Sequence, residues 1–243
     1  MSYKDITRIK MKKSVFKNFY AFLAVIVTAF GGVLTSCSSN DENTPAIFYD
    51  IATLTGMGTD GCTFTLRQVN DSPLVTLTST YQLNNQTYKV GTRYLIAYSN
   101  ETNQAFVSGG ITLQALGYVY NSEITTGTSE STNQWRTEQQ YLLAMWRAGE
   151  WINIQTNATY DKERPTAYDL VVDETTLGND YPEAFIIYEP DKSVNATTKL
   201  FYATFNIEEV WNRPNVKGLN VTFVGNNGPQ TVKFDKSANA TND

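Results

Sequence analysis

The chain has 243 residues, of which 41% are hydrophobic and 18% are charged, and it contains no histidine. Histidine is the usual general base and the commonest metal ligand, so its absence excludes Ser-His and Cys-His nucleophile pairs and most zinc sites. After residue 36, 13 Lys and Arg stand against 23 Asp and Glu. A body this acidic argues against nucleic acid as a partner, because that affinity comes largely from neutralising phosphates.

Residues 1–36 have the three-part layout of a secretory signal. A basic head comes first, and its cations are Lys4, Arg8, Lys10, Lys12, Lys13 and Lys17. The uncharged run Phe19–Leu34 follows, and it is shorter than the roughly 20 residues of a membrane-spanning helix. The sequence "LTSC" then ends at Cys37 and fits the lipobox of bacterial lipoproteins. We therefore predict cleavage before Cys37 and attachment of lipid, palmitate included, to its thiol.

Two alternatives stay open at this end of the chain. The apolar run could be a transmembrane anchor that is not cleaved, and Met11 could be the true start. Residues 37–45 are polar and contain two carboxylates, so we expect a flexible acidic tether. This tether resembles the export signal of surface lipoproteins. We expect a lipid-anchored protein of the outer membrane, exposed at the cell surface or, alternatively, facing the periplasm.

The body of the chain has an all-β pattern, because short runs of Thr, Tyr, Phe, Val and Ile alternate with Gly, Asn and Asp. Residues 46–120 contain five or six short strands, which suits a small barrel. The predicted strands are Ala46–Gly56, Cys62–Val69, Leu74–Thr80, Thr92–Ser99, Ala105–Ser108 and Ile111–Tyr120. Cys62 alternates with apolar residues and is predicted to be a small buried side chain.

The stretch "NSEITTGTSESTN" follows with one aliphatic side chain, so residues 121–134 are predicted to be a linker. Residues 135–236 resume the strand pattern and fit a β-sandwich. Its predicted strands are Gln139–Arg147, Trp151–Thr156, Thr166–Asp173, Ala184–Glu189, Lys199–Ile207, Lys217–Gly225 and Gln230–Asp235. "NNG" at 226–228 predicts a tight hairpin turn, "IEEVWN" predicts a helical turn, and residues 237–243 are expected to be a disordered tail.

No segment carries a catalytic signature. Carboxylates that are neighbours on a strand point to opposite faces, so the acidic clusters of this chain do not by themselves form a glycosidase pair. No loop has the oxygen spacing of a calcium site. We therefore expect no enzyme activity, no catalytic residue, no metal and no cofactor.

The best binding candidate is the strand "EWINIQ". Ile152 and Ile154 share one face of this strand, whereas Trp151, Asn153 and Gln155 share the other. A large ring among amides is typical of a sugar-stacking platform. The same pattern is typical of a tryptophan at a seam between two domains, and this is the interpretation that we favour. The sugar-stacking alternative stays open, and it makes Trp151 and Asn153 the candidate binding residues.

The chain resembles the NigD-like lipoprotein family. The resemblance is carried by the lipobox with its acidic tether and by "YDIATLTG", "VGTRYLIAYS", "WRAGEWINIQ" and "LNVTFVGNNGPQTVKFD". It implies an N-terminal OB-type barrel and a C-terminal β-sandwich, and it implies no defined activity. We expect a binding or accessory module for a glycan or an envelope protein. The alternative that the family name suggests is immunity to a secreted toxin.

Overall fold

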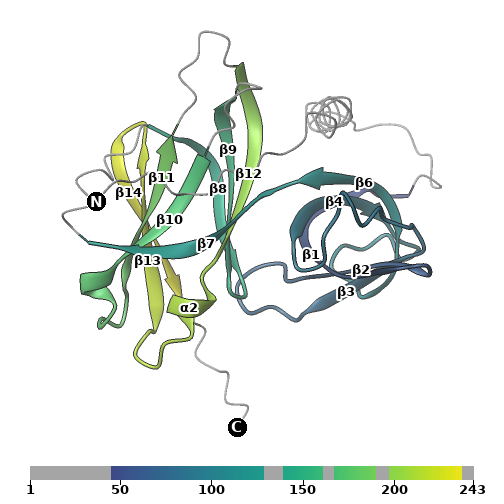
Figure 1. The fold of residues 1–243 in the computed structure, drawn as a ribbon, viewed down its shortest axis with the longest axis horizontal. Helices are drawn as coiled ribbons and strands as arrows, with labels where there is room; N and C mark the ends of the chain where they lie inside the picture. Colours follow the sequence, from purple (N-terminus) through teal and green to yellow (C-terminus); the bar gives the residue numbers. More distant parts are fainter. Residues whose placement is uncertain (1–44, 129–138, 161–166, 190–196, 237–243) are drawn as a thin grey trace.

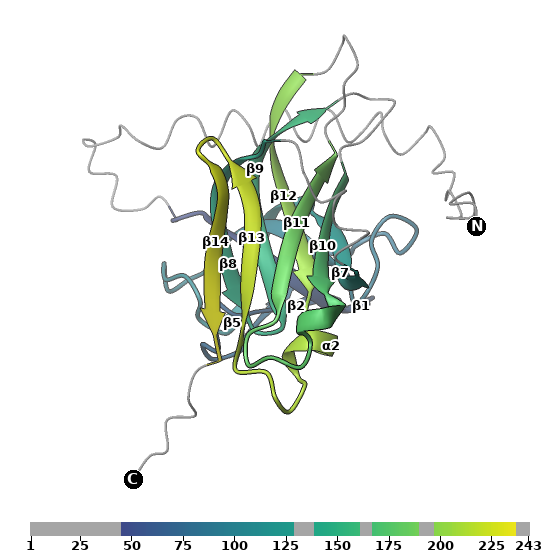
Figure 2. The same ribbon diagram turned by 90° about the vertical axis from the view of Figure 1, so that its left-hand side faces the viewer.

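The computed structural model describes residues 45–128, 139–160, 167–189 and 197–236, and nearly all of its regular structure is β. Six strands form one sheet and eight form another (Figure 1). The first sheet curls into a barrel, and the second folds into two layers that lie beside it (Figure 2). The predicted class, a small barrel followed by a sandwich, is confirmed.

The barrel sheet has the order β5-β3-β2-β1-β4-β6. Its strands are β1 (Phe48–Gly58), β2 (Gly61–Leu66), β3 (Val75–Ser79), β4 (Arg93–Ser99), β5 (Gly109–Gly110) and β6 (Thr112–Tyr118). β5 and β6 act as one interrupted strand, because β5 runs parallel to β3 and β6 runs antiparallel to β4. The meander of β1, β2 and β3 and the pair of β4 with β6, closed in this way, form the five-stranded, partly open barrel of the OB fold.

Alternate residues of the barrel strands point inward and form one apolar core. Ala52, Leu54, Phe64, Leu77 and Ile96 are all completely buried there. The free thiol of Cys62 lies in the same core, as its alternating pattern predicted. Burial raises the pKa of this thiol, which keeps it protonated and unreactive at neutral pH.

The second sheet has the order β14-β13-β11-β10-β7-β12-β9-β8. Its strands are β7 (Tyr120–Gly127), β8 (Tyr141–Ala148), β9 (Trp151–Tyr160), β10 (Ala167–Asp173), β11 (Glu183–Glu189), β12 (Thr197–Asn206), β13 (Gly218–Gly225) and β14 (Gly228–Asp235). Two short helices, η2 (Glu174–Thr176) and α2 (Glu208–Trp211), lie in its connections. All seven strands predicted after residue 134, the hairpin turn at 226–228 and the helical turn are present.

Strand β7 joins the two layers of the sandwich. Its first half pairs in parallel with β12, from Tyr120 to Glu123, and its second half pairs in parallel with β10, from Ile124 to Gly127. β7 therefore changes layers between Glu123 and Ile124. Ile124 then reaches the core between the layers, together with residues of β9 to β13.

The linker predicted over 121–134 is wrong for its first half, because residues 121–127 belong to β7, in the middle of the larger sheet. Thr and Ser supply the extended conformation here, and Ile124 is the one aliphatic anchor. Residues 129–134 of the predicted linker lie outside the described residues. The predicted tether, apart from Pro45, and the predicted tail at 237–243 also lie outside them.

The strand predicted at Ala105–Ser108 is also wrong. Phe106 has a φ of +58°, and the segment is a turn that precedes β5. An aromatic residue rarely adopts this left-handed conformation. The ring of Phe106 packs against the barrel core, so the apolar residues of this segment cover the core and do not extend the ladder.

The position of β7 predicts which fragments of the chain can fold. A fragment of residues 119–243 retains β7, and we expect it to give cooperative thermal unfolding by circular dichroism. A fragment of residues 129–243 leaves unpaired edges on β10 and β12, so we expect it to remain unfolded. Both fragments lose the barrel equally, so the difference isolates β7. Cooperative unfolding of the shorter fragment at the same temperature would show that β7 is dispensable.

Candidate functional site

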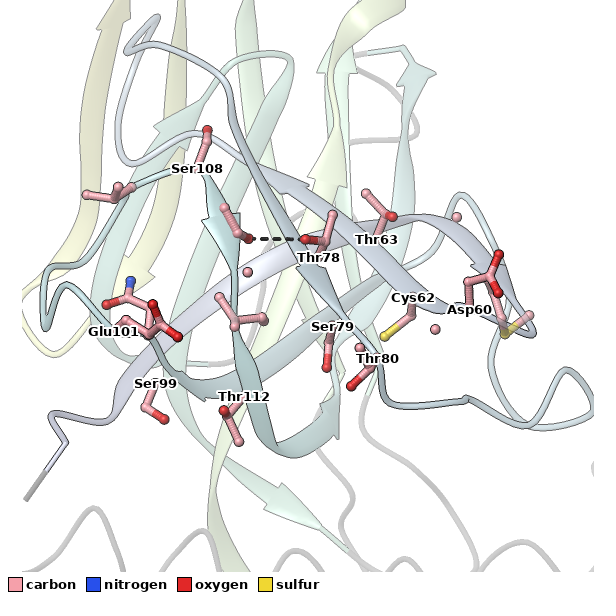
Figure 3. Close-up of a pocket in the computed structure, with 18 of the residues that line it drawn as sticks. Asp60, Cys62, Thr63, Thr78, Ser79, Thr80, Ser99, Glu101, Ser108 and Thr112 are labelled. Atoms are coloured by element: carbon pink, nitrogen blue, oxygen red, sulfur yellow. Dashed lines mark hydrogen bonds between the residues drawn. The ribbon is translucent and has the colours of Figure 1, made fainter.

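A groove of about 1050 Å³ opens at one end of the barrel. Its walls come from the end of β1, the start of β2, the end of β3, the loop that follows β4 and the segment Val107–Thr112. Figure 3 shows Ser79, Thr80 and Thr112 among the lining residues, with Asp60 and Glu101 at opposite sides of the view. The OB fold commonly uses this region, near the loops after its first and fourth strands, to bind oligomers.

The groove lining is rich in hydroxyl groups, and it includes no basic or aromatic residue among those that the structure describes. Its hydroxyl groups come from Thr59, Thr63, Thr78, Ser79, Thr80, Ser99, Thr102, Ser108 and Thr112. Two of them also hold the walls in place: Thr78 Oγ1 donates to the carbonyl of Gly109 at 3.4 Å, and Ser108 Oγ accepts from the Thr76 amide at 3.0 Å. The groove thus offers hydrogen bonds and two carboxylates to a bound molecule.

Arg93 lies at the seam between the two sheets and is 2% exposed. Its Nη1 donates to Asn153 Oδ1 and to Thr204 Oγ1, both at 2.7 Å, and its Nη2 donates to the carbonyl of Ile51 at 3.0 Å. All of these acceptors are neutral. Burial lowers the pKa of Arg93 to about 9, so the guanidinium keeps its charge at neutral pH.

The two residues predicted as binding candidates belong to this seam. Asn153 is completely buried and accepts hydrogen bonds from Arg93 and Thr204, so its assignment as a ligand contact is wrong. Trp151 is half-buried, and the guanidinium carbon of Arg93 lies 4.9 Å from the centre of its ring. This cation–π contact matches the alternative that we favoured, a tryptophan that seals a domain seam.

A second buried arginine, Arg147, connects the sandwich to the barrel at another part of the seam. Arg147 has no exposed side-chain surface, and its guanidinium pairs with both carboxylate oxygens of Asp71, at 2.8 and 2.7 Å. It also lies 4.5 Å from the Trp211 ring centre. The neighbouring backbone joins the two sheets directly, because the Asn70 amide donates to the Arg147 carbonyl and the Gly149 amide donates to the Asn70 carbonyl.

Apolar side chains fill the space between the two arginines. Ile51, Leu95 and Val119 are buried there, with Trp146 and Tyr202 packed against them. A cavity of about 200 Å³ remains at this position, and it is lined in part by Arg67, Arg93 and Gln155. The seam therefore consists of a packed centre between two arginine clusters, which makes it a structural element.

One carboxylate is placed inside the barrel. Asp50 Oδ2 accepts a hydrogen bond from the Tyr98 hydroxyl at 2.9 Å. Burial raises the pKa of Asp50 to about 6, and the hydrogen bond from Tyr98 opposes this shift. Asp50 thus titrates closer to neutral pH than an ordinary aspartate, but it does not line the groove.

Among the described residues, no three His, Cys, Asp or Glu side chains come together as a metal site. The described segments also contain no helix long and apolar enough to cross a membrane. Cys37, the predicted lipidation site, lies outside those segments. The groove itself was not predicted, because its lining residues come from five separate stretches of the chain, Pro45 among them, with no common motif.

The protein is therefore an all-β protein of two domains, in which an OB-type barrel packs against a β-sandwich through the seam. No protein-family model matches the sequence, and no curated protein matches it. Solved structures do match. A protein of unknown function from Bacteroides vulgatus is 15% identical with a TM-score of 0.64, over 80% of this chain and 93% of that one.

Two further structures share the fold. A candidate toxin-related protein from Parabacteroides distasonis is 16% identical with a TM-score of 0.57, over 79% of this chain and 95% of that one. A candidate lipoprotein from Bacteroides fragilis is 12% identical with a TM-score of 0.55, over 80% and 100%. A NigD-like immunity protein from Bacteroides caccae, of the family that the sequence resembles, also matches, with 11% identity and a TM-score of 0.47 over 78% and 92%.

The Arg147–Asp71 pair generates a stability prediction. Asp71→Ala leaves a buried guanidinium without its carboxylate, and we expect it to lower the free energy of unfolding by about 2–4 kcal/mol. Urea denaturation measures this loss. The control is Asp180→Ala, which removes an exposed ion pair with Lys217 at 2.7 Å. We expect the control to stay close to the wild type. Equal losses in both variants would show that the seam pair adds nothing beyond a surface pair.

Proposed function

We propose that this chain is a lipid-anchored envelope protein that acts by binding a partner, and that the groove of the barrel is its binding surface. The observation that carries the proposal is the groove itself. It holds about 1050 Å³, and its lining is rich in hydroxyl groups that can bond a ligand. The cavity at the seam is smaller, at about 200 Å³, and the guanidinium groups of Arg93 and Arg147 in the seam bond to neighbouring side chains.

A binding role fits the chemistry of the groove better than catalysis. A serine or threonine hydroxyl needs an adjacent base to become a nucleophile, and the chain has no histidine. The thiol that lines the groove, Cys62, is buried, and its pKa is raised. Asp60 and Glu101 lie at opposite sides of the hollow in Figure 3 and do not form a close carboxylate pair.

The lipobox and the likeness to a candidate lipoprotein support an anchor at Cys37. Pro45 lines the groove, and Cys37 lies eight positions before it in the sequence. Eight residue steps span at most about 28 Å when fully extended. The groove therefore lies close to the membrane that holds the lipid, which we propose to be the outer membrane, with the protein displayed at the cell surface.

A second candidate function is immunity to a secreted toxin. It is favoured by one structural relative with a TM-score of 0.57, which is described as toxin-related. The genes beside this one discriminate between the two candidates. A toxin gene supports immunity, whereas outer-membrane transporter genes support an accessory binding role.

The anchor is tested by Cys37→Ser. We expect this variant to lose labelling by a palmitate analogue and to accumulate as the uncleaved precursor, because only a cysteine thiol accepts the lipid. Cys62→Ser is the matched control and should be labelled like the wild type. Continued labelling of the Cys37 variant would contradict the lipobox.

The binding surface is tested by site-specific photo-crosslinking in intact cells. A photoreactive residue at Thr80 or Glu101, both exposed in the groove, should trap the same partner. The control position is Glu174, an exposed residue of η2 in the sandwich, which should trap none of it. If neither groove position yields a crosslinked species, or if Glu174 traps the same partner, the groove is not the binding surface.

A further inference from the structure

Five glycines line the groove, and the protein's own geometry explains three of them. Gly56 lies at a β-bulge in β1, where the register with β2 shifts. A Cβ at Gly61 would lie 1.9 Å from the Ser79 carbonyl oxygen, so β3 packs directly on this residue. Gly109 has a φ of +148°, which favours glycine.

The other two, Gly58 and Gly110, have no such explanation. A Cβ built on either residue meets no atom within 4 Å, and neither has a positive φ. Both lie in strands, where glycine weakens the sheet and commonly marks the close approach of a ligand or of another backbone. Each glycine pairs through its backbone, Gly58 with Gly61 and Gly110 with Thr78, but no described residue occupies the space where its side chain would be. The groove therefore presents bare backbone at two points where a side chain would fit.

The barrel is also open beside these glycines. β3 pairs with β5 only through Leu77 and Thr78, and one further backbone bond joins the Ile111 amide to the Thr78 carbonyl at 2.8 Å. Among the described strands, β6 has a single neighbour, β4. The side of β6 that faces away from β4 is thus an open strand edge, and Thr112 at its start lines the groove. An extended segment can form main-chain hydrogen bonds with such an edge.

The residue types that line the groove favour one class of polymer among those that an OB barrel can bind. Single-stranded nucleic acid needs cations and aromatic platforms, and the described residues of the groove lining include neither. These residues therefore provide no stacking surface on which a sugar ring would lie. They do provide a glycine-lined floor, hydroxyl groups, the open edge of β6 and two carboxylates, Asp60 and Glu101. These features suit a polypeptide, and the carboxylates favour one without acidic side chains.

We propose that the groove binds an extended polypeptide segment of neutral or positive charge, which crosses Gly58 and Gly110 and adds a strand at the open edge of β6. This inference rests on the proposed binding function and names the chemistry of its partner. The hydroxyl groups of Thr78, Thr80 and Thr112 would then contact side chains of the segment, whereas its backbone would pair with the open edge of β6.

The test uses the mature lipoprotein in detergent and a phage-displayed library of random peptides. Selected peptides are then measured by fluorescence anisotropy against Gly58→Val, Gly110→Val and the control Gly178→Val. A Cβ at Gly178 also meets open space, but Gly178 lies in the sandwich, outside the groove. The same protein is applied to a glycan array, so that the other class of ligand is measured in parallel.

We expect peptides without net negative charge, whose affinity falls roughly tenfold or more in both groove variants because the valine blocks the floor. The Gly178 variant should bind like the wild type, and all three variants should keep the wild-type melting temperature. Selection of no peptide, or peptides that bind the groove variants normally, would overturn the inference. Glycan binding that Gly58→Val abolishes would also overturn it while leaving the proposed binding function intact.

Discussion

Arg93 brings a charged guanidinium into the interior of the protein, where its hydrogen-bond acceptors are an amide oxygen, a hydroxyl and a backbone carbonyl. Burying a charge without a counter-ion is costly, and the lowered pKa of about 9 records that cost. The cost is tolerable only when every acceptor is in place. One acceptor lies on β1 and two lie on the sandwich, so the guanidinium fixes how the two sheets meet. The side chain of Asn121 completes this arrangement, because its amide pairs with the Arg93 backbone in both directions, at 3.0 Å each.

Most strands of this fold could be predicted from the sequence, because each alternates apolar and polar residues over a length typical of strands. Two segments could not. β7 has only one aliphatic side chain, that of Ile124. Its backbone is held by parallel pairing with β12 in its first half and with β10 in its second half, so its side chains contribute little. Ala105–Ser108 has apolar residues in a strand-like order, but Phe106 adopts a left-handed conformation to cover the barrel core. In both cases tertiary contacts outweigh the local pattern.

The candidate site was harder to predict than the fold. Trp151 and Asn153 stood out in the sequence because large and polar residues share a face there, and the same feature describes a buried seam. The position of Arg93 decides between the two, but it lies 60 residues from Asn153 in the chain. The groove gave no signal, because threonine, serine and glycine are common in all β-rich sequences. Only the closure of β5 onto β3 brings its five segments together.

The place of β1 in the barrel has a mechanical consequence. β1 lies between β2 and β4 and pairs antiparallel with both, and the chain enters it directly from Pro45. A force that pulls on the N-terminal side therefore loads two ladders in shear, so that many backbone hydrogen bonds must break together. Along β1 the load passes Ile51, whose carbonyl accepts from Arg93 in the seam, and then reaches Gly56–Gly58, which is a wall of the groove. A pull from the N-terminal side therefore acts on the seam and on the groove through the same strand.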